Sequence, residues 1–150
     1  MLPSYLKDYS ISDKDLNRPW GGFYYINNSD LSKFSSEFFP NYDIDITNPI
    51  SPKILIINPE KRLSFQYHNR RKEIWSVIKG PVGVVRSYTD DENIIQTLQT
   101  GDIITIDKQE RHRLIGLDNI AIVAELWCHT DINHLSDEND IIRLQDDYNR

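Results

Sequence analysis

Four side chains in the middle of the chain have the types and the spacing of metal ligands. Gln66 and His68 lie two residues apart in an alternating segment, so both face the same side of a strand. Glu73 follows after a short turn and shares its face with Trp75, which indicates an interior rather than a solvated surface. A later alternating segment opens with His112. Because imidazole, carboxylate and amide groups suit borderline divalent ions, we predict one divalent metal ion bound by Gln66, His68, Glu73 and His112.

Basic side chains lie close to these ligands in the sequence. Arg62 shares the strand face of Gln66 and His68, and Arg70 lies in the turn that precedes Glu73. Any one of these cations is by default a solvated surface residue. Guanidinium groups, however, bind phosphate oxygens in pairs through their planar fork. We therefore predict phosphate binding near the metal by Arg18, Lys61, Arg62, Arg70 and Arg150.

The elements that must position these residues are short β-rich runs separated by turn residues, as in an all-β sandwich or barrel. They occupy residues 53–58, 62–68, 73–79, 82–88, 93–99, 102–107, 112–117 and 121–127. Proline and glycine interrupt the preceding segment, which predicts an irregular N-terminal arm with a short helix near residues 30–38. The acidic end of the chain is expected to fold as a tail over the barrel mouth. One domain therefore spans residues 1–150, with an arm at 1–52, a barrel at 53–128 and a tail at 129–150.

Length, charge and composition exclude several classes of protein. The 150 residues suit a single domain with a proper core. A formal net charge of -6 and a pI near 5.1 argue against wholesale binding to nucleic acid or to an anionic membrane. No apolar run approaches the roughly 20 residues that span a bilayer. Cys128 is the single cysteine, and Lys7 and Asp8 interrupt the place of a signal peptide, so we predict a cytoplasmic protein.

Two segments resemble the two motifs of the cupin superfamily. The first is QYHNRRKEIWSVIKG, which starts at residue 66, and the second is GDIITIDKQERHRL, which starts at residue 101. The resemblance implies a double-stranded β-helix, or jelly-roll barrel. In it Gln66 and His68 take the places of the usual His-x-His pair. Glu73 takes the acidic place and His112 that of the late histidine.

The sequence is more specifically similar to the cupin isomerase domain of type II mannose-6-phosphate isomerases. The supporting segments are RPWG at 18–21, KRLSFQYH at 61–68, DIIR at 140–143 and DDYNR at 146–150. One departure precedes the late histidine, where Asp107 and Gln109 replace the usual proline and glycine of the cupin motif. The turn that presents His112 is therefore expected to differ from that of the family.

This similarity implies a metal-dependent isomerase that interconverts an aldose, mannose 6-phosphate, and a ketose, fructose 6-phosphate, through an enediol. The implied metal is zinc, with manganese, iron or nickel as alternatives, and it would polarise the carbonyl oxygen of the substrate. Glu73 is committed to the metal, so another acid must act as the base. The candidates are Glu125, Asp146 and Asp147, while Arg143 and Arg150 are expected to stabilise the anion. The predicted catalytic residues are Arg143, Asp147 and Glu125.

Other functions stay open at this point. The isomerase substrate could be another phosphosugar, such as a phosphoheptose, or the chain could be a metal-containing cupin that binds a sugar or nucleotide sugar without converting it. A metal oxygenase is compatible with His68, Glu73 and His112, although Gln66 in the fourth place argues against it. The expected partner is a phosphorylated sugar, with no nucleic acid and no membrane.

Three further expectations concern packing and assembly. Cupins commonly pair through their sheets, which implies a homodimer, and the aromatic run at 23–25 is suited to extend a neighbour's sheet. His129 and His134 follow the barrel in a polar segment and are expected at the surface. Trp20 and Trp75 are expected to pack inside the barrel.

Overall fold

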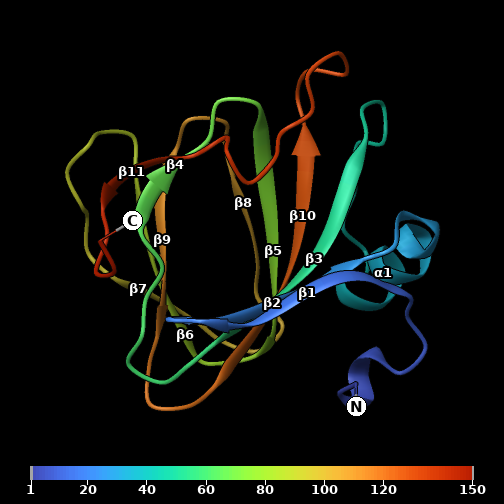
Figure 1. Ribbon diagram of the computed structural model, residues 1–150, viewed down its shortest axis with the longest axis horizontal. Helices are drawn as coiled ribbons and strands as arrows, with labels where there is room; N and C mark the ends of the chain where they lie inside the picture. The colour runs from blue at the N-terminus through green and yellow to red at the C-terminus, as the bar shows by residue number, and fades with distance from the viewer. Residues whose placement is uncertain (1, 150) are drawn as a thin grey trace.

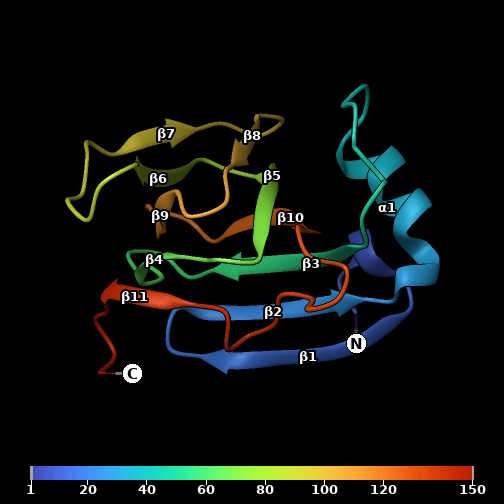
Figure 2. The same cartoon turned by 90° about the horizontal axis from the view of Figure 1, so that it is seen from above.

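The computed structural model describes residues 2–149, and its strands form two antiparallel β-sheets. A six-stranded sheet has the order β1-β2-β3-β10-β5-β8, and a five-stranded sheet has the order β11-β4-β9-β6-β7. Helix α1 lies at one end of the molecule and β11 at the other (Figures 1 and 2). This is the two-sheet jelly-roll architecture that the sequence predicts.

The six-stranded sheet contains β1 (Ile11–Arg18), β2 (Gly21–Ile26), β3 (Ile50–Ile57), β5 (Arg71–Lys79), β8 (Ile103–Ile106) and β10 (Ala121–His129). The five-stranded sheet contains β4 (Phe65–Tyr67), β6 (Val82–Ser87), β7 (Gln96–Leu98), β9 (Arg111–Gly116) and β11 (Ile142–Gln145). The helices are α1 (Leu31–Phe38) and two 3-10 helices, η1 (Ser4–Leu6) and η2 (Asn28–Asp30). The predicted strands at 62–68 and 93–99 are shorter than expected: β4 and β7 have three residues each, and Arg62 forms only an isolated bridge to Ile115. Within residues 2–149, no helix has the length and apolar character needed to cross a membrane.

Strand β10 is buried along nearly its whole length because both of its faces are covered, and it is mostly apolar apart from Glu125 and His129. Val123 belongs to the core between the two sheets, together with Trp75. Its neighbour Leu126 points to the opposite face, into a second core that includes Phe34 and Phe38 of α1. A strand buried on both faces reads as a continuous apolar run. The helix predicted near residues 30–38 is confirmed as α1, and its phenylalanines form the cover of the outer face.

The prediction of an irregular N-terminal arm is wrong, because this part of the chain supplies two strands as well as the helix. β1 pairs with β2 and β2 pairs with β3, so the segment widens the six-stranded sheet. Gly21 makes the tight turn between β1 and β2 possible. Its φ is 149°, and a Cβ atom at this position would lie 1.9 Å from the carbonyl oxygen of Ile56. The turn brings Arg18 and Trp20 to a cavity that Glu73 and Trp75 of β5 also line.

Two boundaries of the sheet also differ from the prediction. The barrel strands begin at Ile50, inside the segment assigned to the arm. The aromatic run at 23–25 lies in β2, which has a neighbouring strand on each side, so it has no free edge to extend another sheet. β1 is the edge strand at this end of the sheet.

The chain after β10 crosses the end of β5 and then joins the other sheet. The Thr130 N–H donates to the Arg70 carbonyl oxygen (3.0 Å), and Arg71 Nη1 donates to the Asp137 carbonyl oxygen (3.2 Å). β11 then pairs with β4 at the edge of the five-stranded sheet. The tail therefore lies over the barrel mouth, as predicted, and Figure 1 shows it reaching β4 from β10.

Candidate metal centre

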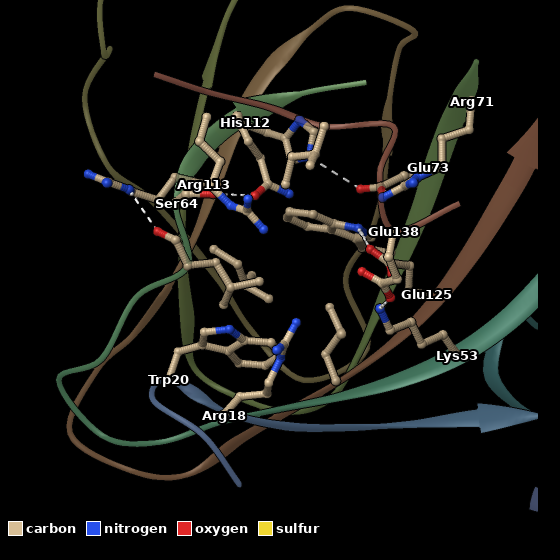
Figure 3. Close-up of a pocket in the computed structure, with 17 residues that line it drawn as sticks. Arg18, Trp20, Lys53, Ser64, Arg71, Glu73, His112, Arg113, Glu125 and Glu138 are labelled. Atoms are coloured by element: carbon tan, nitrogen blue, oxygen red, sulfur yellow. Dashed lines mark hydrogen bonds and ion pairs between the residues drawn. The ribbon is translucent and has the colours of Figure 1, made fainter. Parts of the chain in front are cut away.

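Three of the four predicted ligands converge at the barrel mouth. His68, Glu73 and His112 are buried, and their ligand atoms lie within 4.8 Å of one another. The distance from His112 Nε2 to Glu73 Oε1 is 3.3 Å (Figure 3). The distance from His68 Nε2 to Glu73 Oε2 is 3.5 Å. Ligand atoms about 2.1 Å from a common ion stand about 3 Å apart when adjacent. The group is therefore compact enough to share one ion.

The two imidazoles turn the same nitrogen toward this point. His68 Nδ1 lies 2.7 Å from the Asp140 carbonyl oxygen, and His112 Nδ1 lies 2.8 Å from the Glu110 carbonyl oxygen. A carbonyl oxygen only accepts hydrogen bonds, so each Nδ1 carries the proton and each Nε2 presents a lone pair. Metal-binding histidines are held in this way in many proteins.

Two buried atoms at the centre lack a hydrogen-bond partner among the described residues, Glu73 Oε1 and His112 Nε2. A buried polar atom without a partner costs free energy. An ion between these two atoms would satisfy both of them. The residues present therefore fit a divalent ion, with His68, Glu73 and His112 as the ligands.

The protonation states of the ligands also suit a metal. Burial, above all, lowers the pKa of His68 to about 3, so its imidazole is neutral near pH 7. Burial opposes ionisation of Glu73, but the Arg71 guanidinium together with His68 and His112 outweighs it, so the pKa of this carboxyl lies well below its usual value. Neutral imidazoles and an ionised carboxylate are the forms that bind a cation.

Gln66 lies beside these ligands but turns its amide oxygen away from them. Its Oε1 accepts a hydrogen bond from Ser64 Oγ, and its Nε2 lies 3.3 Å from His68 Nε2. Gln66 pairs with His112 across β4 and β9, so the predicted neighbourhood is correct. To act as a ligand, Gln66 must rotate its amide group by half a turn so that Oε1 faces the ion. The ligand role of Gln66 therefore stays a prediction.

Arg71 is a member of the centre that the sequence analysis missed. Its Nε donates to Glu73 Oε2 (2.8 Å), its Nη2 donates to His68 Nε2 (3.2 Å), and its guanidinium carbon lies 3.7 Å from the ring centroid of Trp127. A metal on His68 would replace only the second contact. Arg71, Glu73 and Trp75 alternate along β5, so the signal was present in the sequence.

The turn before His112 accommodates the departure from the cupin motif. Gln109 has a φ of 67°, the left-handed conformation that favours glycine. Its N–H donates to the His68 carbonyl oxygen (2.9 Å), and its Nε2 donates to Asn69 Oδ1 (3.1 Å). These two bonds hold the left-handed residue and tie the two ligand-bearing segments together.

A cavity of about 60 Å³ adjoins the centre. The cations that line it are Arg18, Lys53, Arg71, Arg113 and Arg143, and the acids are Glu73, Glu125 and Glu138. Arg18 and Trp20 lie on the side of the cavity opposite His112 (Figure 3). The tail supplies part of the wall through Glu138, Ile141 and Arg143.

Glu125 is the buried acid in this cavity that the predicted ligand set does not use. Trp75 Nε1 donates to its Oε2 (2.9 Å) and Trp127 Nε1 donates to its Oε1 (2.8 Å). Burial, followed by the charge of Glu73, raises the pKa of Glu125 to about 7. A carboxyl with this pKa can take up and return a proton near neutral pH.

Lys53 and Glu138 form a further charged pair of the wall that the sequence did not indicate. Lys53 Nζ lies 3.1 Å from Glu138 Oε1 and 4.4–4.9 Å from the ring centroids of Phe23, Tyr25 and Trp127. Lys53 begins the predicted strand at 53–58, so its alternation with Leu55 could have placed it in the cavity. The pairing with Glu138, which lies 85 residues later, has no local signal.

The structure brings only some of the predicted cations and acids to the cavity. Arg18, Arg143 and Glu125 line it, whereas Lys61, Arg62, Arg70 and Asp147 are not among the lining residues. Arg62 and Asp147 bind each other through two hydrogen bonds of 2.7 and 2.9 Å. The physical reason is that β4 starts at Phe65, so the alternation that placed Arg62 beside the ligands does not continue to it.

Arg70, Lys61 and Arg150 complete the account of the predicted substrate-binding residues. Arg70 is paired with two acids of the tail: its Nη2 lies 3.5 Å from Asp137 Oδ1, and its Nη1 lies 3.8 Å from Asp140 Oδ1. Lys61 is exposed, and Arg150 lies outside the described residues. The histidines after the barrel were predicted at the surface. This is wrong for His129, which is 3% exposed and bonds to Ser51 Oγ and the Ser136 N–H. It is confirmed for His134, which is exposed.

Comparisons with known proteins agree with this geometry. Residues 7–146 match the family described as mannose-6-phosphate isomerase C-terminal. Solved structures with the same fold include oxalate decarboxylase from Bacillus subtilis, a protein with Mn(II) centres (14% identity, TM-score 0.63, 91% of this chain and 32% of that chain). Another is CapF, a capsular polysaccharide assembling protein from Staphylococcus aureus (16% identity, TM-score 0.62, 96% of this chain and 35% of that chain). Nothing matched among the curated protein sequences.

These likenesses carry different weight. The chain spans about a third of the length of the two solved structures, and identities of 14% and 16% show a shared fold alone. The family match covers nearly the whole chain and includes His68, Glu73 and His112. The chain is therefore a cupin that belongs to the family of mannose-6-phosphate isomerase C-terminal domains.

Proposed function

We propose that this chain is a metal-dependent sugar-phosphate isomerase, with mannose 6-phosphate and fructose 6-phosphate as the preferred pair. Family membership supports a sugar-related function. The observation that carries the isomerase proposal is the place of Glu125, whose pKa is about 7, in the same cavity as Glu73 and His112. Isomerisation needs a cation at the carbonyl oxygen and a proton carrier nearby, and this cavity offers a site for each.

The proposed reaction moves one proton between neighbouring carbons. Glu125 as a carboxylate takes the proton from C2 of the open-chain aldose and, as the acid, returns it to C1, while the O2 proton passes to O1. The two indole N–H donors fix the carboxylate against the cavity. A divalent ion held by His68, Glu73 and His112, zinc being expected and manganese, iron or nickel the alternatives, would polarise the carbonyl oxygen.

The opposite side of the cavity supports recognition of the phosphate group. Arg18 lies there and Arg143 also lines the space. Among the described residues, Arg18 Nε is a buried atom without a hydrogen-bond partner, and the nearest acid oxygen, on Asp15, is 3.9 Å away. A phosphate oxygen would accept the hydrogen bond that Arg18 Nε can donate. The sugar would then lie with its phosphate at Arg18 and its carbonyl end at the metal ligands.

The size of the cavity adds a condition to this proposal. A space of about 60 Å³ is too small for a phosphorylated sugar. Glu138, Ile141 and Arg143 belong to the tail, so displacement of the tail is the shortest route to a larger space. We infer that the tail opens to admit the sugar and closes to exclude water during proton transfer.

The experiment that tests the function is a panel of phosphorylated aldoses in deuterated water, with and without added zinc, manganese, iron or nickel. Mannose 6-phosphate is expected to acquire deuterium at C1 or C2 and to yield fructose 6-phosphate. Saturable binding of a phosphosugar or nucleotide sugar with neither conversion nor exchange would replace the isomerase by a sugar-binding cupin. Oxygen consumption with any of these metals would indicate an oxygenase. Lack of both conversion and exchange with every aldose, in folded and metal-saturated protein, would overturn the proposal.

Arg18→Gln is expected to raise the KM for the phosphorylated substrate about 10-fold or more, because a charge-assisted hydrogen bond contributes about 1.5 to 3 kcal/mol. The matched control is Arg62→Gln, which removes a predicted phosphate ligand that the structure pairs with Asp147 instead. Steady-state kinetics should show an unchanged KM for this control. Equal effects of the two substitutions would contradict the placement of the phosphate at Arg18.

A further inference from the structure

Asp140 is a buried acid in a tail segment that is otherwise mostly exposed. It is 3% exposed, and between Asp131 and Asp140 only Ser136 is comparably buried. Asp140 Oδ1 accepts from the Asn69 N–H (2.9 Å), and Oδ2 accepts from the Arg70 N–H (3.0 Å) and from Ser136 Oγ (2.6 Å). One carboxylate therefore binds both the tail and the turn that joins β4 to β5.

The backbone of the same residue reaches a metal ligand. The Asp140 carbonyl oxygen accepts the hydrogen bond from His68 Nδ1 (2.7 Å), across 72 residues of sequence. The side chain thus holds the turn that follows His68, while the carbonyl group selects the nitrogen that His68 presents. Both contacts depend on the tail lying against the end of β5.

The second imidazole has no such dependence. His112 Nδ1 donates to the carbonyl oxygen of Glu110, only two residues away in the same turn and strand. Glu110 is itself buried and accepts from the Asp107 N–H (2.8 Å) and from Arg86 Nε (3.0 Å). His112 is therefore oriented by the barrel, and His68 is oriented by the tail.

We propose that Asp140 is a positioning residue of the metal centre, through which closure of the tail and binding of the metal favour each other. The proposal rests on the metal centre of the proposed function and not on its substrate. When the tail is closed, His68 is fixed with Nε2 toward Glu73 and His112. When the tail is open, the His68 ring is free to rotate and to exchange its proton between nitrogens. Since coupling between two sites is reciprocal, bound metal must in turn hold the tail closed.

The first test measures zinc affinity by competition with a chromogenic chelator, using the full chain. Asp140→Ala keeps the backbone carbonyl but releases the tail that positions it, so zinc binding is expected to weaken about 10-fold or more, toward the 10- to 100-fold cost of losing a partner of a metal-bound histidine. Asp140→Asn should have a smaller effect, because its amide oxygen still accepts one of the backbone hydrogen bonds. Asp118→Asn, a change of the same kind at an exposed acid in the turn after β9, is the control and should bind zinc as the wild type does.

The second test separates positioning from general destabilisation. Nitrogen-15 spectra of the metal-free protein report which ring nitrogen of each histidine carries the proton. In Asp140→Ala the His68 signal should change to a mixture of tautomers, while the His112 signal keeps its Nδ1–H form. Hydrogen exchange should also slow in residues 136–142 when zinc binds to the wild type. A merely structural role of Asp140 would alter both histidines or neither.

The outcomes decide between the proposals. Two results together would overturn the role of Asp140. They are a zinc affinity of Asp140→Ala within about threefold of wild type, which is smaller than the expected loss, and an unchanged His68 tautomer. If Asp140→Ala fails to fold, Ser136→Ala takes its place in both tests. It removes the 2.6 Å bond to Asp140 and the 2.9 Å bond from Arg71 Nη1, while Arg71 keeps its bond to Glu73. A wild type that binds no zinc, manganese, iron or nickel removes the centre and this proposal together. A wild type that binds metal without converting phosphosugars removes the isomerase alone.

Discussion

His112→Asn is expected to abolish stoichiometric metal binding and to reduce turnover about 100-fold or more, the usual cost of losing an electrostatic stabiliser of a developing oxyanion. Asparagine retains a nitrogen that can donate to the Glu110 carbonyl oxygen, as His112 Nδ1 does at 2.8 Å. It has no counterpart of Nε2, the unpartnered atom that faces Glu73. Elemental analysis and the deuterium assay measure the two losses.

The fold should survive this substitution, because the removed ring atoms border an existing cavity. Thermal unfolding without metal should place the variant within about 1 to 3 kcal/mol of the wild type. His134→Asn, which changes an exposed histidine of the tail, serves as the control and should keep both metal and turnover. A His112→Asn protein that still binds one equivalent of zinc with unchanged affinity would exclude His112 as a ligand.

Glu125→Gln is expected to lower turnover about 100- to 10,000-fold, the range attributed to a positioned acid or base, while metal binding persists. Glutamine has nearly the same shape and keeps one acceptor for the indole donors, but it cannot carry the proton. In the wild type, kcat should fall as pH falls through the pKa of Glu125, since the base becomes protonated. That pKa is about 7 without metal, and a bound cation lowers it. A variant with full turnover would show that another group moves the proton.

The same substitution has a signature in stability. The pKa of Glu125 is raised from 4.5 to about 7 in the folded protein, so its contribution to stability is complete below about pH 4.5. This contribution is lost as pH rises through 7, because the ionised carboxylate is then buried. Urea unfolding of metal-free protein should therefore show that the free energy of unfolding falls more between pH 5 and pH 8 for the wild type than for Glu125→Gln. Equal losses would contradict the raised pKa.

The barrel could be predicted from the sequence because its strands alternate regularly and turn residues separate them. The segments 73–79, 82–88, 102–107, 112–117 and 121–127 correspond to β5, β6, β8, β9 and β10 with small shifts at the ends. The arm could not be predicted in the same way. β1 is an edge strand with mostly exposed, charged side chains, so it lacks an apolar period. Its pairing with β2 depends on the turn at Gly21 and on contact with β3.

The metal ligands could be predicted because the motif sets both their types and their strand positions. Arg62 shows the limit of this reasoning, since one irregular step before Phe65 was enough to remove it from the face that it was assigned to. Of the residues that enter the site from the tail, Arg143 was predicted from the family resemblance, but Asp140 and Glu138 had no local signal. Asp140 and Glu138 reach His68 and Lys53 from 72 and 85 residues away, and only the folded chain brings them together.

The tryptophans add a practical consequence of this architecture. The chain has three of them. Trp20 and Trp75 line the cavity, while Trp127 donates to Glu125 and lies against the Arg71 guanidinium. Indole emission responds to the polarity and charge of its immediate surroundings. Because no tryptophan lies elsewhere in the sequence, the tryptophan fluorescence of the unlabelled protein, excited at wavelengths that tyrosine does not absorb, comes entirely from the surroundings of this one cavity. The protein therefore has its own optical probe, against which metals and sugars can be titrated directly.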